Sequence, residues 1–176
     1  MAGPWLLLGA GEDPGAPRGA KPNQEAAVVD GTTLELRIAN DLEEVSGLIE
    51  AVEAFCEEQG APQKVSYQLC LVIDEIVTNI ISYAYEDAGR HEIRLRFEAR
   101  DSGLSGIIED DGKPFNPLTD SAAPDLDADI DDRPIGGLGV FFLKSFMDSV
   151  GYERDGGLNR LSFAKTLVPA PAGNEA

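Results

Sequence analysis

The spacing of apolar residues changes from segment to segment along this chain, and this change limits the folds that it can adopt. Alternating polar and apolar residues predict half-buried strands, whereas apolar residues three or four positions apart predict amphipathic helices. The predicted elements, in order, are a strand at 32–38, helices at 42–56 and 64–85, strands at 93–99 and 104–109, a helix at 140–148, and strands at 150–154 and 158–167. The predicted hairpins favour an antiparallel or mixed sheet, so we expect an α+β fold of two layers with helices on one face.

The chain of 176 residues has the length of one domain with tails. Residues 1–30 and 169–176 are rich in Gly, Pro and Ala and are predicted to be terminal tails, which leaves 31–168 as the domain. The stretch 119–132 contains six aspartates and little periodicity. Because long loops in compact domains commonly carry function or are disordered, this loop is a candidate functional segment.

The charge of the chain limits its partners. Thirty-two acidic and fourteen basic residues give a net charge of −18, which opposes direct contact with nucleic acid or anionic membranes. No window of eighteen apolar residues is found, so no membrane span is expected. Cys56 and Cys70 lie among apolar neighbours, which favours reduced core thiols in a cytoplasmic protein over a disulfide. Together with the single His91 they cannot build a zinc site.

Polar residues form a narrow stripe along the second predicted helix. Glu75, Asn79 and Ser82 lie at positions i, i+4 and i+7 and therefore share one face. An ordinary solvent-exposed face is one interpretation. Because the stripe is narrow and flanked by apolar residues, the Glu75 carboxylate is also a candidate general base at the mouth of a cleft. The Asn79 amide oxygen is a hard ligand of the kind that suits Mg²⁺.

Asp110, Asp111 and Gly112 directly follow a predicted strand. A simple turn is the common outcome for such a sequence. The functional alternative is that one aspartate accepts a hydrogen bond from the exocyclic amine of a purine, while Gly112 lets the base approach closely.

A glycine-rich stretch, Gly136-Gly137-Leu138-Gly139, runs directly into the helix predicted at 140–148. Unpaired N–H groups at a helix start attract anions, and glycines let a phosphate come close. A flexible linker before a core helix is the alternative, but the preceding Arg133-Pro134 favours a phosphate cradle. The stretch lacks Gly-Lys-Ser/Thr and is therefore not a P-loop.

Three short motifs, in this order, resemble the N, G1 and G2 boxes of the GHKL (histidine-kinase-like) ATPases: Glu75…Asn79, Asp110-x-Gly112 and Gly136-Gly137-Leu138-Gly139. Four segments are similar to the anti-sigma-factor serine/threonine kinases of that superfamily: DEIVTNIISYAY, EDDGKPFNPL, DDRPIGGLGVFFLKSFMD and GLNRLSFAKTL. The resemblance covers residues 31–168 and implies a Bergerat-type sandwich.

The resemblance also implies a role for each box. Glu75 would polarise the attacking hydroxyl as the catalytic base, and Asn79 would hold Mg²⁺. Asp110 would bind the adenine amino group, and the loop at 117–135 would be the ATP lid. The implied nucleotide-binding residues, with an arginine that we infer from its place beside the cradle, are Asn79, Asp110, Gly112, Arg133, Gly136, Gly137, Leu138 and Gly139.

The function that the resemblance implies is an ATP-dependent serine/threonine kinase that uses ATP and Mg²⁺ and releases ADP. Its partners would be a STAS-type anti-anti-sigma protein, which it phosphorylates, and a sigma factor, which it sequesters. A homodimer is common in the resembling group and stays open for this chain. The alternatives are a nucleotide-binding partner-switch module without transfer and a plain acidic interaction protein. The catalytic domain of a sensor histidine kinase is disfavoured, because His91 opens a strand and no dimerisation helices precede the domain.

Overall fold

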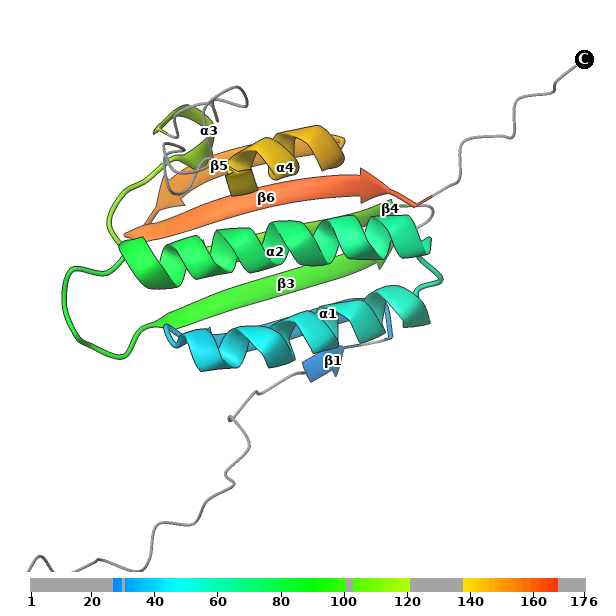
Figure 1. The fold of residues 1–176 in the computed structure, drawn as a ribbon, viewed down its shortest axis with the longest axis horizontal. Helices are drawn as coiled ribbons and strands as arrows, with labels where there is room; N and C mark the ends of the chain where they lie inside the picture. Colours follow the sequence, from blue (N-terminus) through cyan, green and yellow to red (C-terminus); the bar gives the residue numbers. More distant parts are fainter. Residues whose placement is uncertain (1–26, 30, 101–102, 121–137, 168–176) are drawn as a thin grey trace, which may run out of the picture.

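The sheet of this protein is antiparallel throughout. The computed structural model describes residues 27–29, 31–100, 103–120 and 138–167. Within them, six strands are hydrogen-bonded in the order β1-β2-β3-β4-β6-β5 (Figure 1). Their bounds are Ala27–Val29 for β1, Thr33–Ala39 for β2, Glu92–Arg100 for β3, Gly103–Asp110 for β4, Ser149–Asp155 for β5 and Leu158–Thr166 for β6.

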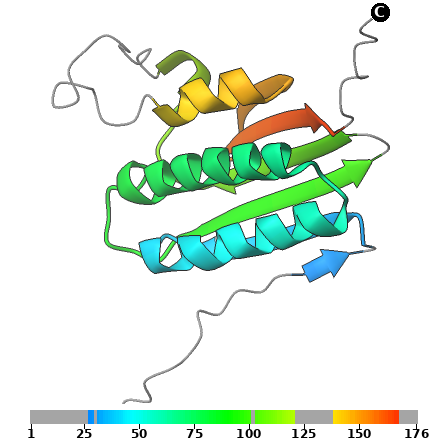
Figure 2. The same ribbon diagram turned by 45° about the vertical axis from the view of Figure 1, so that its right-hand side comes forward.

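The longer helices cover one face of this sheet. Figures 1 and 2 show α1, α2 and α4 on the same side, with α2 between the other two. Their bounds are Val45–Glu58 for α1, Gln63–Tyr83 for α2 and Leu138–Phe146 for α4; the short helices are η1, Leu42–Glu44, and α3, Pro117–Asp120. The predicted α+β fold with helices on one face is confirmed, and of the two predicted kinds of sheet the antiparallel one is present.

The core forms where the apolar face of the sheet packs against the apolar faces of the helices. In β2 the alternate residues Leu34, Leu36 and Ile38 point to the helices and are buried. Each such side chain contributes roughly 1.5–3 kcal/mol when it leaves water. A Cβ on Gly106 of β4 would collide with the ring of Phe163 on the neighbouring strand, which explains a glycine in mid-strand.

Helix α2 is the central helix of the sandwich. Among the described helices it alone is long and apolar enough, by length and composition, to cross a membrane. Its buried residues, however, pack against the sheet and the other helices: Leu69, Val72, Ile73, Ile76 and Val77. We therefore assign α2 to the protein core.

Two element boundaries depend on hydrogen bonds rather than on periodicity. Asp41 accepts a hydrogen bond from the Glu43 N–H at 3.0 Å and begins the helical segment. Strand β1 lies inside the predicted tail 1–30, and Ala27 pairs with Glu35 of β2. Three residues are too few to show alternation, so the sequence could not predict this edge strand.

The opposite face of the sheet is not covered by any described helix (Figure 2). It carries cross-strand ion pairs, such as Arg96 with Glu35 and Arg160 with Glu109, both at 2.7 Å. A depression of about 510 Å³ lies among these side chains. Such exposed pairs contribute about 0–1 kcal/mol each. None of the predicted site residues that the structure describes lines this depression.

Candidate nucleotide-binding site

The described residues of the three predicted boxes meet along α2. The turn after β4 docks on the C-terminal end of α2, where the Lys113 N–H donates to the Ala84 carbonyl at 2.9 Å. An ideal Cβ on Gly112 would lie 2.6 Å from the Ala84 Cβ, so only glycine fits this contact. The start of α4 packs farther back on α2, where an ideal Cβ on Gly139 would lie 2.8 Å from the Glu75 Cβ. The fold therefore brings together residues that are far apart in the sequence.

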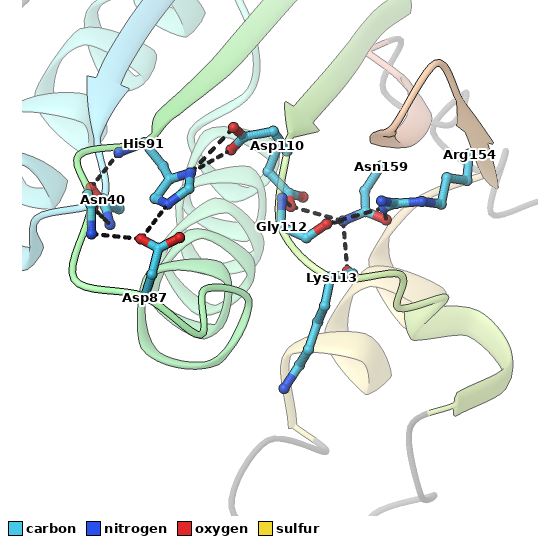
Figure 3. Close-up of polar contacts among 10 residues, drawn as sticks. Asn40, Asp87, His91, Asp110, Gly112, Lys113, Arg154 and Asn159 are labelled. Carbon is cyan, nitrogen blue, oxygen red and sulfur yellow. Dashed lines mark hydrogen bonds and ion pairs between the residues drawn. The ribbon is translucent and has the colours of Figure 1, made fainter.

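Asp110 ends β4 as a buried carboxylate that is 5% exposed. Its Oδ1 accepts hydrogen bonds from the Gly112 N–H at 2.9 Å and from the Asn159 amide at 2.8 Å (Figure 3). Its Oδ2 accepts none from the described residues. Within the described chain, Tyr85 Oη is the only side-chain oxygen or nitrogen that is both fully buried and without a partner. Asp110 Oδ2 also has no partner there, so it is not fully buried and is open to a bound molecule.

Burial and hydrogen bonding act in opposite directions on Asp110. Burial raises the pKa of this carboxyl above its ordinary value, and the charge of Asp111 adds to the rise. The hydrogen bonds from Asn159 and Gly112 lower the pKa, because they favour the ionised form. The net shift is upward.

The Asn159 side chain is itself held in place by the β5–β6 hairpin. Its Oδ1 accepts a hydrogen bond from Tyr152 Oη at 2.8 Å. It accepts another from Arg154 Nη1 at 2.6 Å (Figure 3). Arg154 Nη1 also donates to the Gly112 carbonyl at 3.1 Å. We did not predict these three residues as part of the site. One signal was present: Asn159 is the polar member of the alternating, inward-facing set that also contains Leu161 and Phe163.

The middle of α2 carries the predicted catalytic and metal-binding residues. Glu75 and Asn79 lie one helical turn apart and are partly exposed, and neither side chain forms a hydrogen bond within the described chain. Burial, with a smaller effect from Asp74, raises the pKa of Glu75. Helix α4 is described from Leu138 onward, and the N–H groups at the start of a helix generally attract an anion. The carboxylate of Glu75, the amide of Asn79 and the described start of α4 thus lie at one end of the candidate site.

Part of the predicted phosphate side lies outside the described residues. This holds for Arg133, Gly136 and Gly137 and for most of the predicted lid, 117–135. The lid's first residues form α3, and the Lys144 ammonium of α4 donates to the Leu118 carbonyl at 3.0 Å. The described start of the predicted lid is therefore bonded to α4.

The described residues fit a magnesium ion that arrives with a phosphate ligand. No group of three or more His, Cys, Asp and Glu side chains within the described chain could hold a metal by itself. Magnesium commonly keeps several waters and binds through one or two protein oxygens together with substrate phosphates. Asn79, beside Glu75, is suited to such a shared site.

The chain matches the histidine kinase-like ATPase domain family over residues 38–165. It belongs to that family. The matched stretch contains α2, the Asp110 turn and α4, and the family description implies ATP as the ligand. The predicted membership of the histidine-kinase-like superfamily is confirmed.

Curated relatives of this domain are distant. The serine/threonine-protein kinase BtrW of Bordetella bronchiseptica is 29% identical over 106 residues, which cover 60% of this chain and 74% of the relative. The serine-protein kinase RsbW of Staphylococcus aureus is 28% identical over 129 residues, which cover 71% of this chain and 81% of the relative. A solved structure, the blue-light activated histidine kinase of Erythrobacter litoralis, aligns with a TM-score of 0.45 at 19% identity; the match covers 61% of this chain and 32% of that kinase.

Proposed function

We propose that this chain is an ATP-dependent serine/threonine kinase of the cytoplasm that phosphorylates a STAS-type anti-anti-sigma protein and sequesters a sigma factor. The position of Glu75 carries the proposal. This carboxylate has no partner within the described chain and lies against the described start of α4, and helix starts attract phosphate through their N–H groups. Family membership supports ATP as the ligand, and the names of the curated relatives support serine or threonine as the acceptor.

Each described residue has a separate task in this proposal. Asp110 holds the adenine amine through its open oxygen, and Asn79 offers an amide oxygen to Mg²⁺. Glu75 accepts the proton of the acceptor hydroxyl, and its raised pKa makes it a stronger base than an exposed glutamate. The α4 start stabilises phosphate charge through its N–H groups. Bound Mg-ATP supplies the phosphoryl group.

Several predicted parts complete the proposal. Arg133, Gly136 and Gly137 form the rest of the phosphate side, and 117–135 acts as the lid over the nucleotide. Residues 31–168 form the domain, and its sheet also includes strand β1, Ala27–Val29.

The charge of the chain supports the partner class. A net charge of −18 suits a protein that covers the basic, DNA-binding surface of a sigma factor rather than DNA itself. Two free cysteines, Cys56 and Cys70, agree with a reducing compartment. The complex with a sigma factor should therefore weaken as salt rises.

The proposal is tested by incubating the full chain with Mg-ATP and a cognate STAS protein. Mass spectrometry should find one added phosphate on a Ser or Thr of the STAS protein. Glu75→Ala should abolish the transfer and keep ATP binding, because it removes a proton acceptor and not a phosphate contact. Glu50→Ala, the same change at an exposed position of α1, serves as the matched control and should transfer normally.

Two outcomes would contradict the kinase proposal. Transfer at the wild-type rate by Glu75→Ala would exclude Glu75 as the base. ATP binding without phosphate transfer by the wild type would leave a partner-switch module that responds to nucleotide.

A further inference from the structure

We propose that His91 forms a pH-sensitive bridge that holds the turn after β4 in place, so that nucleotide binds more tightly when this histidine is protonated. The bridge is the row Asp87–His91–Asp111, which joins the loop between α2 and β3 to that turn (Figure 3). The inference rests on the proposed ATP site and adds a regulation to it. It uses the only histidine of the chain, which lies outside the three predicted boxes.

The first step is that both ring nitrogens of His91 face carboxylates. Nδ1 lies 3.0 Å from Asp111 Oδ1, and Nε2 lies 3.0 Å from Asp87 Oδ1. An ionised carboxylate only accepts hydrogen bonds, whereas a neutral imidazole has one donor nitrogen and one acceptor nitrogen. The neutral ring would therefore place a lone pair against one of the carboxylates, and only the imidazolium satisfies both contacts.

The second step is that the ring cannot easily turn away when it loses its proton. Its face stacks on Tyr85, with ring centroids 4.2 Å apart and 17° between the planes. Its backbone is fixed to the end of β2, because the His91 N–H donates to Asn40 Oδ1 at 2.9 Å and the Asn40 N–H donates to the His91 carbonyl at 3.2 Å. Loss of the proton therefore breaks one carboxylate contact and removes the charge that strengthens the other.

The third step concerns the charges around the ring. Asp87 faces it from the α2–β3 loop and Asp111 from the turn after β4, and the hydrogen bonds to these two carboxylates raise the pKa of His91. The two nearest arginines in the sequence have glutamate partners: Arg90 at 3.9 Å, and Arg94 at 2.6 Å on its own strand. His91 is thus the cation that pairs with both aspartates.

The fourth step connects the bridge with the candidate site. Asp111 lies between Asp110, the proposed contact of the base, and Gly112, which packs against the end of α2. Protonated His91 compensates the charge of Asp111 and holds the turn. With neutral His91, the nucleotide must bind beside a less compensated negative charge and order a less firmly held turn, and both effects lower its affinity.

The expected effect is modest and reciprocal. Exposed charged pairs are weak, so the dissociation constant of Mg-ADP should rise by roughly 2- to 5-fold as His91 loses its proton. Coupling acts equally in both directions. Saturating Mg-ADP should therefore raise the pKa of His91 by the logarithm of this factor, about 0.3–0.7.

The test is a proton NMR titration of the His91 ring in the full chain between about pH 5 and pH 9, free and saturated with Mg-ADP. Because the chain has one histidine, its ring signal is identified directly. The wild type should show the rise in pKa when Mg-ADP binds. An unchanged pKa in protein saturated with Mg-ADP would overturn the inference.

Asp111→Asn tests whether the bridge, rather than the charge of the nucleotide, causes the rise. His91 still titrates beside Asp87 in this variant but no longer pairs with a carboxylate of the turn, so the rise on Mg-ADP binding should disappear. Asp155→Asn, the same change at an exposed position of β5, is the matched control and should keep the rise. An equal rise in Asp111→Asn and the wild type would also overturn the inference, because the charge of the nucleotide alone would explain it.

His91→Gln provides an independent measurement in case Asp111→Asn does not fold. Its side chain does not titrate, so the ratio of wild-type to His91→Gln dissociation constants at each pH cancels the titration of the nucleotide phosphates. This ratio should rise by roughly 2- to 5-fold as the pH rises through the pKa of His91, and a constant ratio would overturn the inference. If the wild type binds no Mg-ADP at any pH, the proposed function fails together with this inference, which is a distinct result from binding without a change in pKa.

Discussion

The two ends of the candidate site are built differently. At the base end, Asp110 and Asn159 are buried and joined to each other and to Tyr152 by hydrogen bonds that exist without a ligand. At the phosphate end, Glu75 and Asn79 are partly exposed and form no hydrogen bond within the described chain. The base end is thus held together before a ligand arrives, whereas Glu75 and Asn79 have no hydrogen-bond partner within the described chain.

We expect this difference to separate the residues that select the ligand from the residues that act on its phosphate. A network of buried hydrogen bonds holds its members in fixed positions, so it discriminates between ligands without being reorganised by them. Unpaired polar groups gain partners only when the ligand is present, which suits groups that act on a reacting phosphate. Substitutions at the two ends should therefore alter different measured quantities.

The largest expected effect comes from Glu75→Ala at the phosphate end. Loss of a general base should lower the rate of phosphate transfer by about 10²- to 10⁴-fold, with little change in the dissociation constant of ATP. Single-turnover transfer and equilibrium binding, measured on the same preparation, separate the two quantities. A large loss of ATP affinity in this variant would mean that Glu75 belongs to nucleotide binding instead.

The next effect comes from Asp110→Asn at the base end. The change keeps the shape and replaces one acceptor oxygen by a donor, so a buried amine loses its partner at a cost of about 1–3 kcal/mol in ATP binding. The rate at saturating ATP should stay close to that of the wild type. If Asp110→Asn binds ATP as the wild type does, the neighbouring Asp111 becomes the better candidate for the base contact.

The rigidity of the base end can be tested through its glycine. Gly112→Ala places a Cβ 2.6 Å from the Ala84 Cβ and 2.9 Å from the Ala84 carbonyl oxygen, and the backbone cannot move aside easily. We expect a loss of about 1–3 kcal/mol in the free energy of unfolding. Gly103→Ala is the matched control, since its nearest neighbour lies at 3.6 Å, an ordinary contact. Equal stability of the two variants would argue against a tightly packed turn.

The smallest effect concerns the pH dependence of stability near the base end. His91 bridges Asp87 and Asp111, with both nitrogen–oxygen distances at 3.0 Å, and it stacks on Tyr85. The hydrogen bond to Asp87, followed by the one to Asp111, raises the pKa of His91. The contribution of His91 to stability is therefore full below its unfolded pKa of about 6.5 and is lost as the pH rises through the folded pKa.

Asp87 contributes with the opposite sign. The hydrogen bond from His91 lowers its pKa, so its contribution is lost as the pH falls through that lowered value. Denaturant unfolding between about pH 5 and pH 8 should show the loss on the alkaline side in the wild type. His91→Gln should show a flatter profile in this range. Identical profiles would exclude a charged bridge at His91.

The fold was largely predictable because the spacing of apolar residues differs clearly between its helices and its strands. Three-to-four spacing located α2, predicted at 64–85 and found at Gln63–Tyr83, and alternation located β3, predicted at 93–99 and found at Glu92–Arg100. These patterns depend on burial of one face, which the sequence displays directly. The antiparallel direction of every pair, by contrast, depends on connections that periodicity alone leaves open.

The base end was only partly predictable. Asp110 and Gly112 are recognisable from a short motif, whereas Asn159 joins them through the register of β4 with β6, where Asp110 lies opposite Asn159. Register follows from the assembled sheet and not from a local pattern. The places of Arg133, Gly136 and Gly137 stay predictions, because they lie outside the described residues.

The central claim, that these segments form one nucleotide site, is tested most directly by thermal unfolding of the full chain with and without Mg-ATP. A ligand that binds only the folded protein stabilises it by about 2.7 kcal/mol at a hundredfold excess over its dissociation constant. The account predicts a rise in Tm that grows with Mg-ATP concentration and is smaller in Asp110→Asn. An unchanged Tm at saturating Mg-ATP and Mg-ADP would contradict it.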